Sequence, residues 1–134
     1  MTAPPGAALG SPFAERFGER EVASMWFNET EIYKKSLELT EVVREATSPM
    51  PVGYAFLRDQ LVRASASVVL NYCEGFARRT PRDRRRFFDQ ARASAVEVMG
   101  GLDVGVALGV IRPTLRDQGA ERAGHVASML RRFK

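Results

Sequence analysis

Apolar residues recur at three- and four-residue spacing along four stretches of the chain, with charged and small polar residues between them. This spacing is typical of helices that bury one face. It predicts helices over about 29–47, 53–78, 81–109 and 113–132. Because only a few residues connect these stretches, consecutive helices are expected to run antiparallel. The chain is therefore predicted to be all-α, an up-down-up-down antiparallel four-helix bundle.

The apolar face of each predicted helix should form the core, and Phe87 and Leu61 in particular are expected to be buried. The glycines and valines of residues 98–111 would also suit a strand, but a single strand would have no partner, so we prefer a helix there. The predicted core-facing positions are Ile32, Tyr33, Ser36, Leu37, Thr40 and Val43, then Leu57, Leu61, Ala64, Ser65, Val68, Tyr72 and Phe76, then Phe87, Phe88, Ala91, Ser94, Ala95, Val98 and Leu102, and last Leu115, Val126, Met129, Leu130 and Phe133.

Local signals mark the ends of these helices. Thr80 is a good N-cap residue, and Pro81 behind it suits the first helical position. Gly109 suits the position just after a helix C-terminus. For the first helix, either Asn28 or Thr30 can supply the N-cap.

The segment before the first helix is predicted to be a flexible or partly docked N-terminal arm over residues 1–27, followed by a four-helix bundle domain over residues 28–134. Residues 1–12 are rich in proline, glycine and alanine and cannot bury enough apolar surface to offset the entropy of ordering. Residues 13–27 carry aromatic side chains that would let this segment dock onto the body, namely Phe13, Phe17, Trp26 and Phe27.

Composition narrows the class of protein. The 134 residues are 45% hydrophobic and 27% charged, which is the profile of one globular domain. No apolar run reaches the roughly 18 residues of a membrane span, and we see no secretory signal. A single cysteine, Cys73, rules out an internal disulfide, and a single histidine, His125, argues against a zinc site or a histidine-centred triad. We expect a cytoplasmic protein with no catalytic residue, metal, cofactor or membrane partner.

Positive charge is concentrated in the second part of the chain. Residues 1–77 hold seven basic and ten acidic residues, whereas residues 78–134 hold thirteen basic and six acidic ones. This asymmetry suggests an anionic partner near the second part. The densest group, called the arginine cluster below, consists of Arg78, Arg79, Arg82, Arg84, Arg85 and Arg86.

The arginine cluster is predicted to bind nucleic acid. Guanidinium groups match phosphate oxygens, and clustered charge gains affinity from counterion release. The cluster lies at the junction of the second and third predicted helices, and Arg82, Arg85 and Arg86 lie away from the apolar stripe. The alternative interpretation is a solvated helix face that Asp83 and Asp89 partly neutralise.

Two ordered motifs support a family resemblance over roughly residues 27–112. The second predicted helix carries a run of small residues followed by Asn71, Glu74 and Gly75, and the third carries Ala-Arg-x-Ser-x-x-Glu from Ala91. The chain resembles the bacterial four-helix-bundle family of proteins encoded in rRNA intervening sequences, which includes the accessory variability determinant of diversity-generating retroelements. The matching residues are Gln60, Leu61, Arg63, Ala64, Ser67, Asn71, Glu74, Gly75, Ala91, Arg92, Ser94 and Glu97, while Val62, Cys73 and Ala93 depart from the pattern.

The resemblance implies a homo-oligomer, a pentamer in the best-known member, and an accessory role with nucleic acid rather than catalysis. The family-motif positions Gln60, Arg63, Ser67, Asn71, Glu74, Gly75, Arg92, Ser94 and Glu97 are interpreted as assembly or structural residues. Asp59 and Arg63 have the spacing of a surface ion pair. Asn71 and Glu74 would equally suit a buried polar network.

Two functions from different classes follow from these observations. The first is a non-enzymatic oligomeric accessory protein that binds the RNA or DNA backbone through its arginines and assists a machine such as a reverse transcriptase. The alternative is a protein-binding scaffold or adaptor with no nucleic-acid role, in which the arginines serve only solubility. An enzyme is the third and least favoured reading.

Overall fold

The computed structural model describes the backbone of residues 19–132 and the side chains of residues 31–132. Its elements are α2 (Glu19–Thr47), a 3₁₀ turn η1 (Val52–Tyr54), α3 (Ala55–Ala77), α4 (Pro81–Ala107) and α5 (Pro113–Arg132). The chain divides into two units, residues 1–32 and 33–134. No strand occurs in the described backbone.

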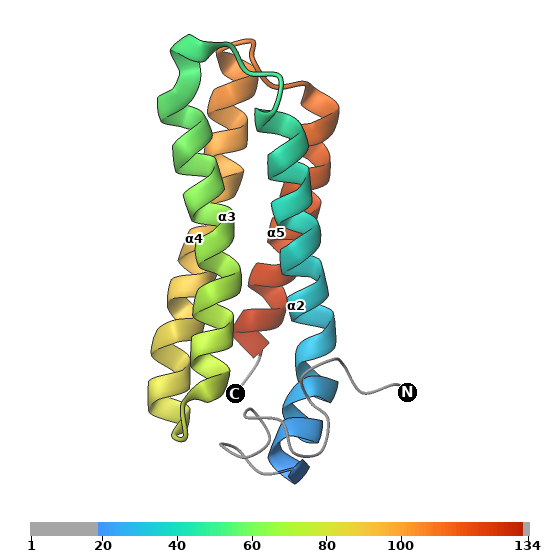
Figure 1. Ribbon diagram of the computed structural model, residues 1–134, viewed down its shortest axis with the longest axis vertical. Coiled ribbons are helices and arrows are strands. Elements are labelled where there is room, and N and C mark those ends of the chain that lie inside the picture. Colours follow the sequence, from blue (N-terminus) through green and yellow to red (C-terminus); the bar gives the residue numbers. More distant parts are fainter. Residues whose placement is uncertain (1–18, 133–134) are drawn as a thin grey trace. The chain divides into compact units, whose positions relative to one another are not determined.

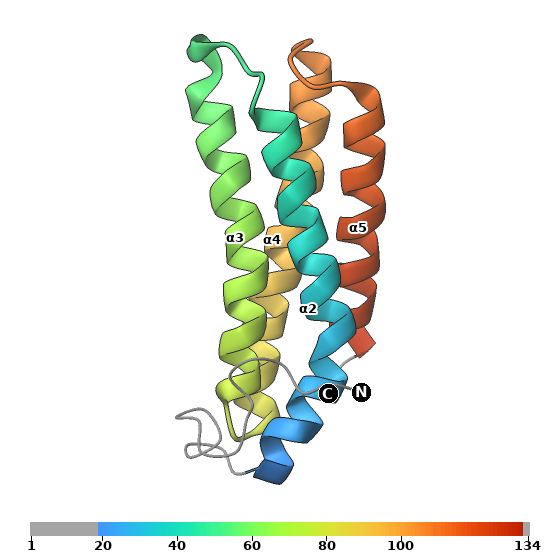
Figure 2. The same cartoon turned by 45° about the vertical axis from the view of Figure 1, so that its right-hand side comes forward.

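The second unit is an antiparallel four-helix bundle. The part of α2 in this unit, α3, α4 and α5 alternate in direction along the chain (Figures 1 and 2). The predicted all-α, up-down-up-down bundle is therefore confirmed. Within the described part of the chain, no helix is both long and apolar enough to cross a bilayer.

The predicted start of the first helix is wrong by about ten residues. Helix α2 begins at Glu19, so Asn28 and Thr30 lie inside the helix and neither can be its N-cap. The physical reason is that no proline or glycine interrupts residues 19–47, and helix propagation continues through residues that lack a strong stop signal. Residues 1–18 and the aromatic side chains expected to dock the arm lie outside the described residues, so the arm and its boundary stay a prediction.

The predicted ends of α4 are confirmed. The Thr80 side chain accepts a hydrogen bond from the backbone N–H of Asp83 at 3.2 Å. At the other end Gly109 has φ +77°, and its N–H donates to the carbonyl of Val106 at 3.0 Å. The N–H of Val110 donates to the carbonyl of Gly105 at 2.9 Å, which completes a Schellman motif. Residues 98–107 are helical, so the strand alternative for this segment is wrong.

The core face of α3 is buried at all seven predicted positions, Leu61 included. Two predictions for other helices are wrong. Phe87 is only half-buried, whereas Phe88 is 3% exposed, because adjacent helical residues are turned by about 100° and only one can face the core. Leu37 is 41% exposed, because Ser36, Leu39 and Val43 form the buried face of α2 instead. The predicted core positions Tyr33, Thr40, Ser94 and Met129 are half-buried, and Phe133 lies outside the described residues.

An aromatic group closes the core near the α3–α4 connection. The ring centroids of Tyr72 and Phe76 are 4.7 Å apart, and Phe88 lies 5.8 Å from each of them. Gly75 permits this packing, because a Cβ at that position would lie 2.5 Å from a ring carbon of Phe88. The first turns of α4 are therefore held against α3 by large buried side chains.

Candidate functional site

The arginine cluster surrounds the short connection between α3 and α4. Arg78 and Arg79 lie in the connection, and Arg82, Arg84, Arg85 and Arg86 lie in the first two turns of α4. The structure therefore brings all six predicted residues to one end of the helix pair. They divide into a set that makes contacts within the protein and a set that does not.

Arg78 and Arg84 stabilise the connection itself. The Arg78 guanidinium lies 2.6 Å from Glu74 Oε1 in an ion pair, and Arg84 Nε donates to the carbonyl of Arg78 at 2.8 Å. The guanidinium carbons of Arg78 and Arg86 lie 4.7 Å and 5.0 Å from the centre of the Phe87 ring. Half-buried Phe87 is thus a platform for two cations rather than a core residue.

The other arginines of the cluster are free to bind a ligand. Arg79, Arg82 and Arg85 are exposed, and none has a hydrogen bond or ion pair among residues 31–132. Arg82 also lies in the first turn of α4, at the positive end of the helix dipole, where a cation is unfavourable. Asp83, the one acidic residue of that first turn, offsets only part of this charge.

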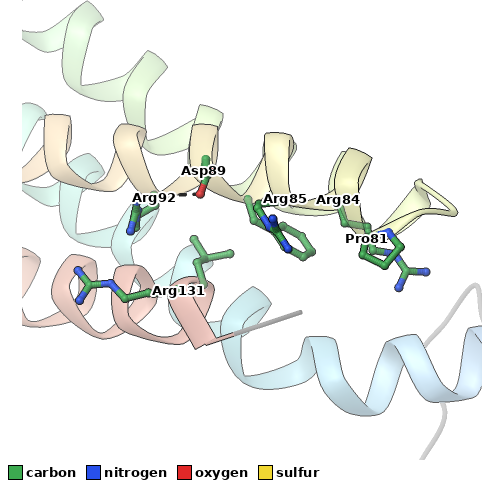
Figure 3. Close-up of a pocket in the computed structure, with 8 residues that line it drawn as sticks. Pro81, Arg84, Arg85, Asp89, Arg92 and Arg131 are labelled. Atoms are coloured by element: carbon green, nitrogen blue, oxygen red, sulfur yellow. Dashed lines mark ion pairs between the residues drawn. The ribbon is translucent and has the colours of Figure 1, made fainter.

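A small cavity lies beside the cluster between α4 and α5 (Figure 3). Arg84 and Arg85 line it together with Arg92 from α4 and Arg131 from α5. Sequence reasoning assigned Arg92 to the family motif and missed Arg131. Arg131 is 46 positions from Arg85 in the chain, and only the antiparallel packing of α5 on α4 brings them to one place. The signal in the sequence that could have identified Arg131 is the pair of adjacent arginines, Arg131 and Arg132, at the end of α5.

Several family-motif residues form a polar seam between α3 and α4. Gln60 Nε2 donates to Glu97 Oε2 at 2.9 Å, and the hydroxyl oxygens of Ser67 and Ser94 lie 2.8 Å apart. Asn71 Nδ2 donates to the carbonyl and the hydroxyl oxygen of Ser67 at 3.0 Å and 2.9 Å. The Gln60–Glu97 and Ser67–Ser94 pairs join α3 to α4 and fix their register, whereas Asn71 bonds within α3 and holds the Ser67 hydroxyl in place.

The remaining family-motif residues do not join this seam. Glu74 pairs with Arg78, and Gly75 packs against Phe88. Arg92 approaches Asp89 at 3.9 Å. Arg63 is exposed, and the ion pair with Asp59 that its spacing suggested is not formed among residues 31–132.

Other candidate chemistry is sparse in the described part of the chain. Cys73 is half-buried rather than buried, and His125 is exposed. Among residues 31–132, no group of three histidine, cysteine, aspartate or glutamate side chains is placed to hold a metal ion. The basic end of α4 is therefore the feature with the clearest capacity to bind a ligand.

Comparison with known proteins returned one family. A family model described as "23S rRNA-intervening sequence protein" matches residues 28–132. The match includes the two sequence motifs on α3 and α4 and residues from all four helices of the bundle. The search of curated proteins gave no match.

Proposed function

The chain belongs to the 23S rRNA-intervening sequence protein family, and from this membership we propose that it is a non-enzymatic accessory protein that binds the phosphate backbone of nucleic acid. The binding surface consists of the three members of the arginine cluster that are exposed and make no hydrogen bond or ion pair with residues 31–132, Arg79, Arg82 and Arg85. The observation that carries the proposal is their position at the N-terminal end of α4. The non-enzymatic part rests on the family resemblance.

The first turn of α4 carries positive charge where a helix disfavours it. A cation in the first turn of a helix costs about 0.3–1 kcal/mol, because it lies against the positive end of the helix dipole. Helix α4 carries Arg82 and Arg84 in that turn, and of these two only Arg84 has a compensating contact among residues 31–132. Such departures from local rules are expected at functional sites. A bound phosphate would remove the conflict, since it is attracted both by the guanidinium groups and by the helix N-terminus.

The three exposed arginines are suited to contact the phosphate backbone of a nucleic acid rather than its bases. Phosphate contacts position a protein on nucleic acid and carry no sequence information by themselves. The three arginines lie on a short connection and the first turns of α4, and they do not form an extended row of side chains along one element. We therefore expect the binding to have weak sequence preference.

We further propose that the machine that this protein assists is a reverse transcriptase. This proposal rests on the resemblance to the accessory variability determinant.

Fluorescence anisotropy with labelled oligonucleotides tests the proposal. The protein should bind single-stranded RNA, single-stranded DNA and duplexes, with affinities that differ little between unrelated sequences of one length. Comparing the three substrates also decides between RNA and DNA. Absence of binding to every substrate at about 10 mM salt, where the Debye length is about 30 Å, would reject the proposal and favour the protein-binding scaffold.

We also propose that the protein is a homo-oligomer, with the pentamer as the family resemblance implies. Large apolar side chains remain exposed on two neighbouring helices of the second unit: Phe56 and Leu70 on α3 are 65% and 67% exposed, and Val96 on α4 is 54% exposed. Phe56 and Leu70 are fourteen residues apart, which places them on one helix face. Polar Gln60 and Arg63 lie between them on that face, and a second copy of the chain would cover the exposed apolar side chains.

Native mass spectrometry checks this assembly. Wild-type protein at micromolar concentration should appear as a pentamer, and Leu70→Glu should shift it to smaller species, because a carboxylate would be buried without a partner. Val52→Glu is the matched control, since Val52 is 89% exposed in η1, outside the α3 helix, and should leave the oligomer intact. A wild-type monomer would contradict the proposal.

A further inference from the structure

The cavity between α4 and α5 has the composition of an anion site. Four arginines line it and one acidic residue, Asp89, opposes them, which gives a formal charge of +3. Its floor includes the buried side chains of Phe88 and Leu130. Figure 3 shows Arg84, Arg85 and Arg92 coming from α4 and Arg131 from α5. The full lining is Pro81, Arg84, Arg85, Phe88, Asp89, Arg92, Leu130 and Arg131.

The size of the cavity limits what it can hold. Its volume is about 170 Å³, comparable to about six water molecules at roughly 30 Å³ each. Pockets for whole small molecules are larger, roughly 300–1,000 Å³. A single phosphate group with its first waters fits this space, and a larger ligand would extend beyond it. A phosphate carried on a longer strand, with the rest of the strand outside, is therefore the ligand that suits both charge and volume.

The side chains are suited to bidentate contact with phosphate. Among residues 31–132, the Arg84 side chain bonds through its Nε to the Arg78 carbonyl and leaves its terminal nitrogens available as donors. Arg92 has one ion-pair partner, Asp89, at the long distance of 3.9 Å. Arg131 is exposed and has no contact among residues 31–132. A phosphate would supply the acceptor that these three guanidinium groups share.

A neighbouring groove on α4 differs in charge from the cavity, so the positive charge does not extend over the whole surface of that helix. That groove carries one arginine and two acidic residues, a formal charge of −1, and it contains the Ser94 and Glu97 ends of the polar seam. Three of the five arginines of α4, namely Arg84, Arg85 and Arg92, line the cavity that faces α5. The full lining of the groove is Arg86, Asp89, Gln90, Ala93, Ser94 and Glu97.

We propose that this cavity is a phosphate site in which Arg131 of α5 and Arg92 of α4 complete the arginine cluster, and that it holds one phosphate group of a bound nucleic-acid strand. This inference rests on the proposed function and adds two residues from outside the cluster to it. The phosphate belongs either to the backbone or to a strand terminus, since both present the same oxygens. A terminal phosphate carries the larger charge, about −1.5 to −2 at pH 7.

The test compares Arg131→Gln with Arg132→Gln. The two arginines are adjacent in the last turn of α5 and both are exposed, but only Arg131 lines the cavity. Each variant removes one charge from the same turn, so net charge and helix-end effects are matched. In fluorescence anisotropy with a labelled single-stranded oligonucleotide, Arg131→Gln should weaken binding about ten-fold, the loss of one charge-assisted hydrogen bond, and Arg132→Gln less than about two-fold. Arg92→Gln should behave as Arg131→Gln does.

Each outcome separates this inference from the proposed function. Equal weakening by Arg131→Gln and Arg132→Gln would overturn the phosphate site while leaving binding by the exposed arginines intact. No binding by wild-type protein would overturn both. The oligonucleotide is used with a 5′-phosphate and with a 5′-hydroxyl. Tighter binding of the phosphorylated form that Arg131→Gln abolishes assigns the cavity to a strand terminus, and equal binding of both forms assigns it to the backbone.

Discussion

Replacing Phe88 by alanine should lower the free energy of unfolding by about 3–5 kcal/mol, the usual cost of removing a buried phenylalanine. Phe88 is 3% exposed, stacks on Tyr72 and packs at a tilt against Phe76. It also fills the space that Gly75 leaves open, so the truncation would create a cavity at the α3–α4 contact. A loss of this size is a large part of the 5–15 kcal/mol that stabilises an ordinary domain.

Phe87→Ala is the matched control, because it removes the same atoms one residue away. Phe87 is half-buried and contacts the guanidinium groups of Arg78 and Arg86, so its loss should cost about 1 kcal/mol. Urea denaturation followed by circular dichroism measures both variants. Equal destabilisation by the two substitutions would mean that the facing of α4 described above is wrong.

The double charge reversal Arg82→Glu with Arg85→Glu should abolish binding and at the same time stabilise the fold. Two charge-assisted contacts are lost and two repulsive charges gained, so affinity should fall roughly 100-fold or more at physiological salt. The free energy of unfolding should rise by about 1 kcal/mol, since acidic side chains near a helix N-terminus interact favourably with its dipole. Anisotropy measures the first effect and thermal unfolding the second.

The opposite signs make this experiment informative. If the arginines served the fold, their reversal would destabilise the protein, and if they served only solubility, binding would not change. Reversing Arg112 and Arg116 to glutamate is a control that changes net charge equally near the start of α5, away from the cluster. A control variant that lost as much affinity would show that net charge alone governs binding.

Much of the bundle could be predicted because its signals are local. The Thr80–Pro81 start and the Gly109 end of α4 depend on a few neighbouring residues, and the structure has both. The predicted start of α2 was wrong because it depended on Asn28 or Thr30 acting as an N-cap. Helix-forming residues continue on both sides of Asn28, so the helix begins earlier, at Glu19. A capping residue marks the start of a helix only where the sequence before it does not itself continue the helix.

The candidate site was harder to predict because it depends on packing. Spacing alone placed both Phe87 and Phe88 on the apolar stripe, and only contact with Tyr72 and Phe76 distinguishes them. The arginine cluster was visible as a run in the sequence, but nothing local shows that Arg84 is engaged while Arg85 is free. Arg131 joins the cavity only through the tertiary fold.

The salt dependence of binding tests most directly the claim that exposed arginines bind phosphates. Each neutralised phosphate contributes a slope of about −0.7 to the plot of log affinity against log salt for single strands. Three contacts from Arg79, Arg82 and Arg85 predict a slope of about −2 or steeper for wild-type protein. The Arg82→Glu, Arg85→Glu variant should leave residual binding too weak to measure or a slope near −0.7. A wild-type slope near zero, or an unchanged slope in the variant, would contradict the account.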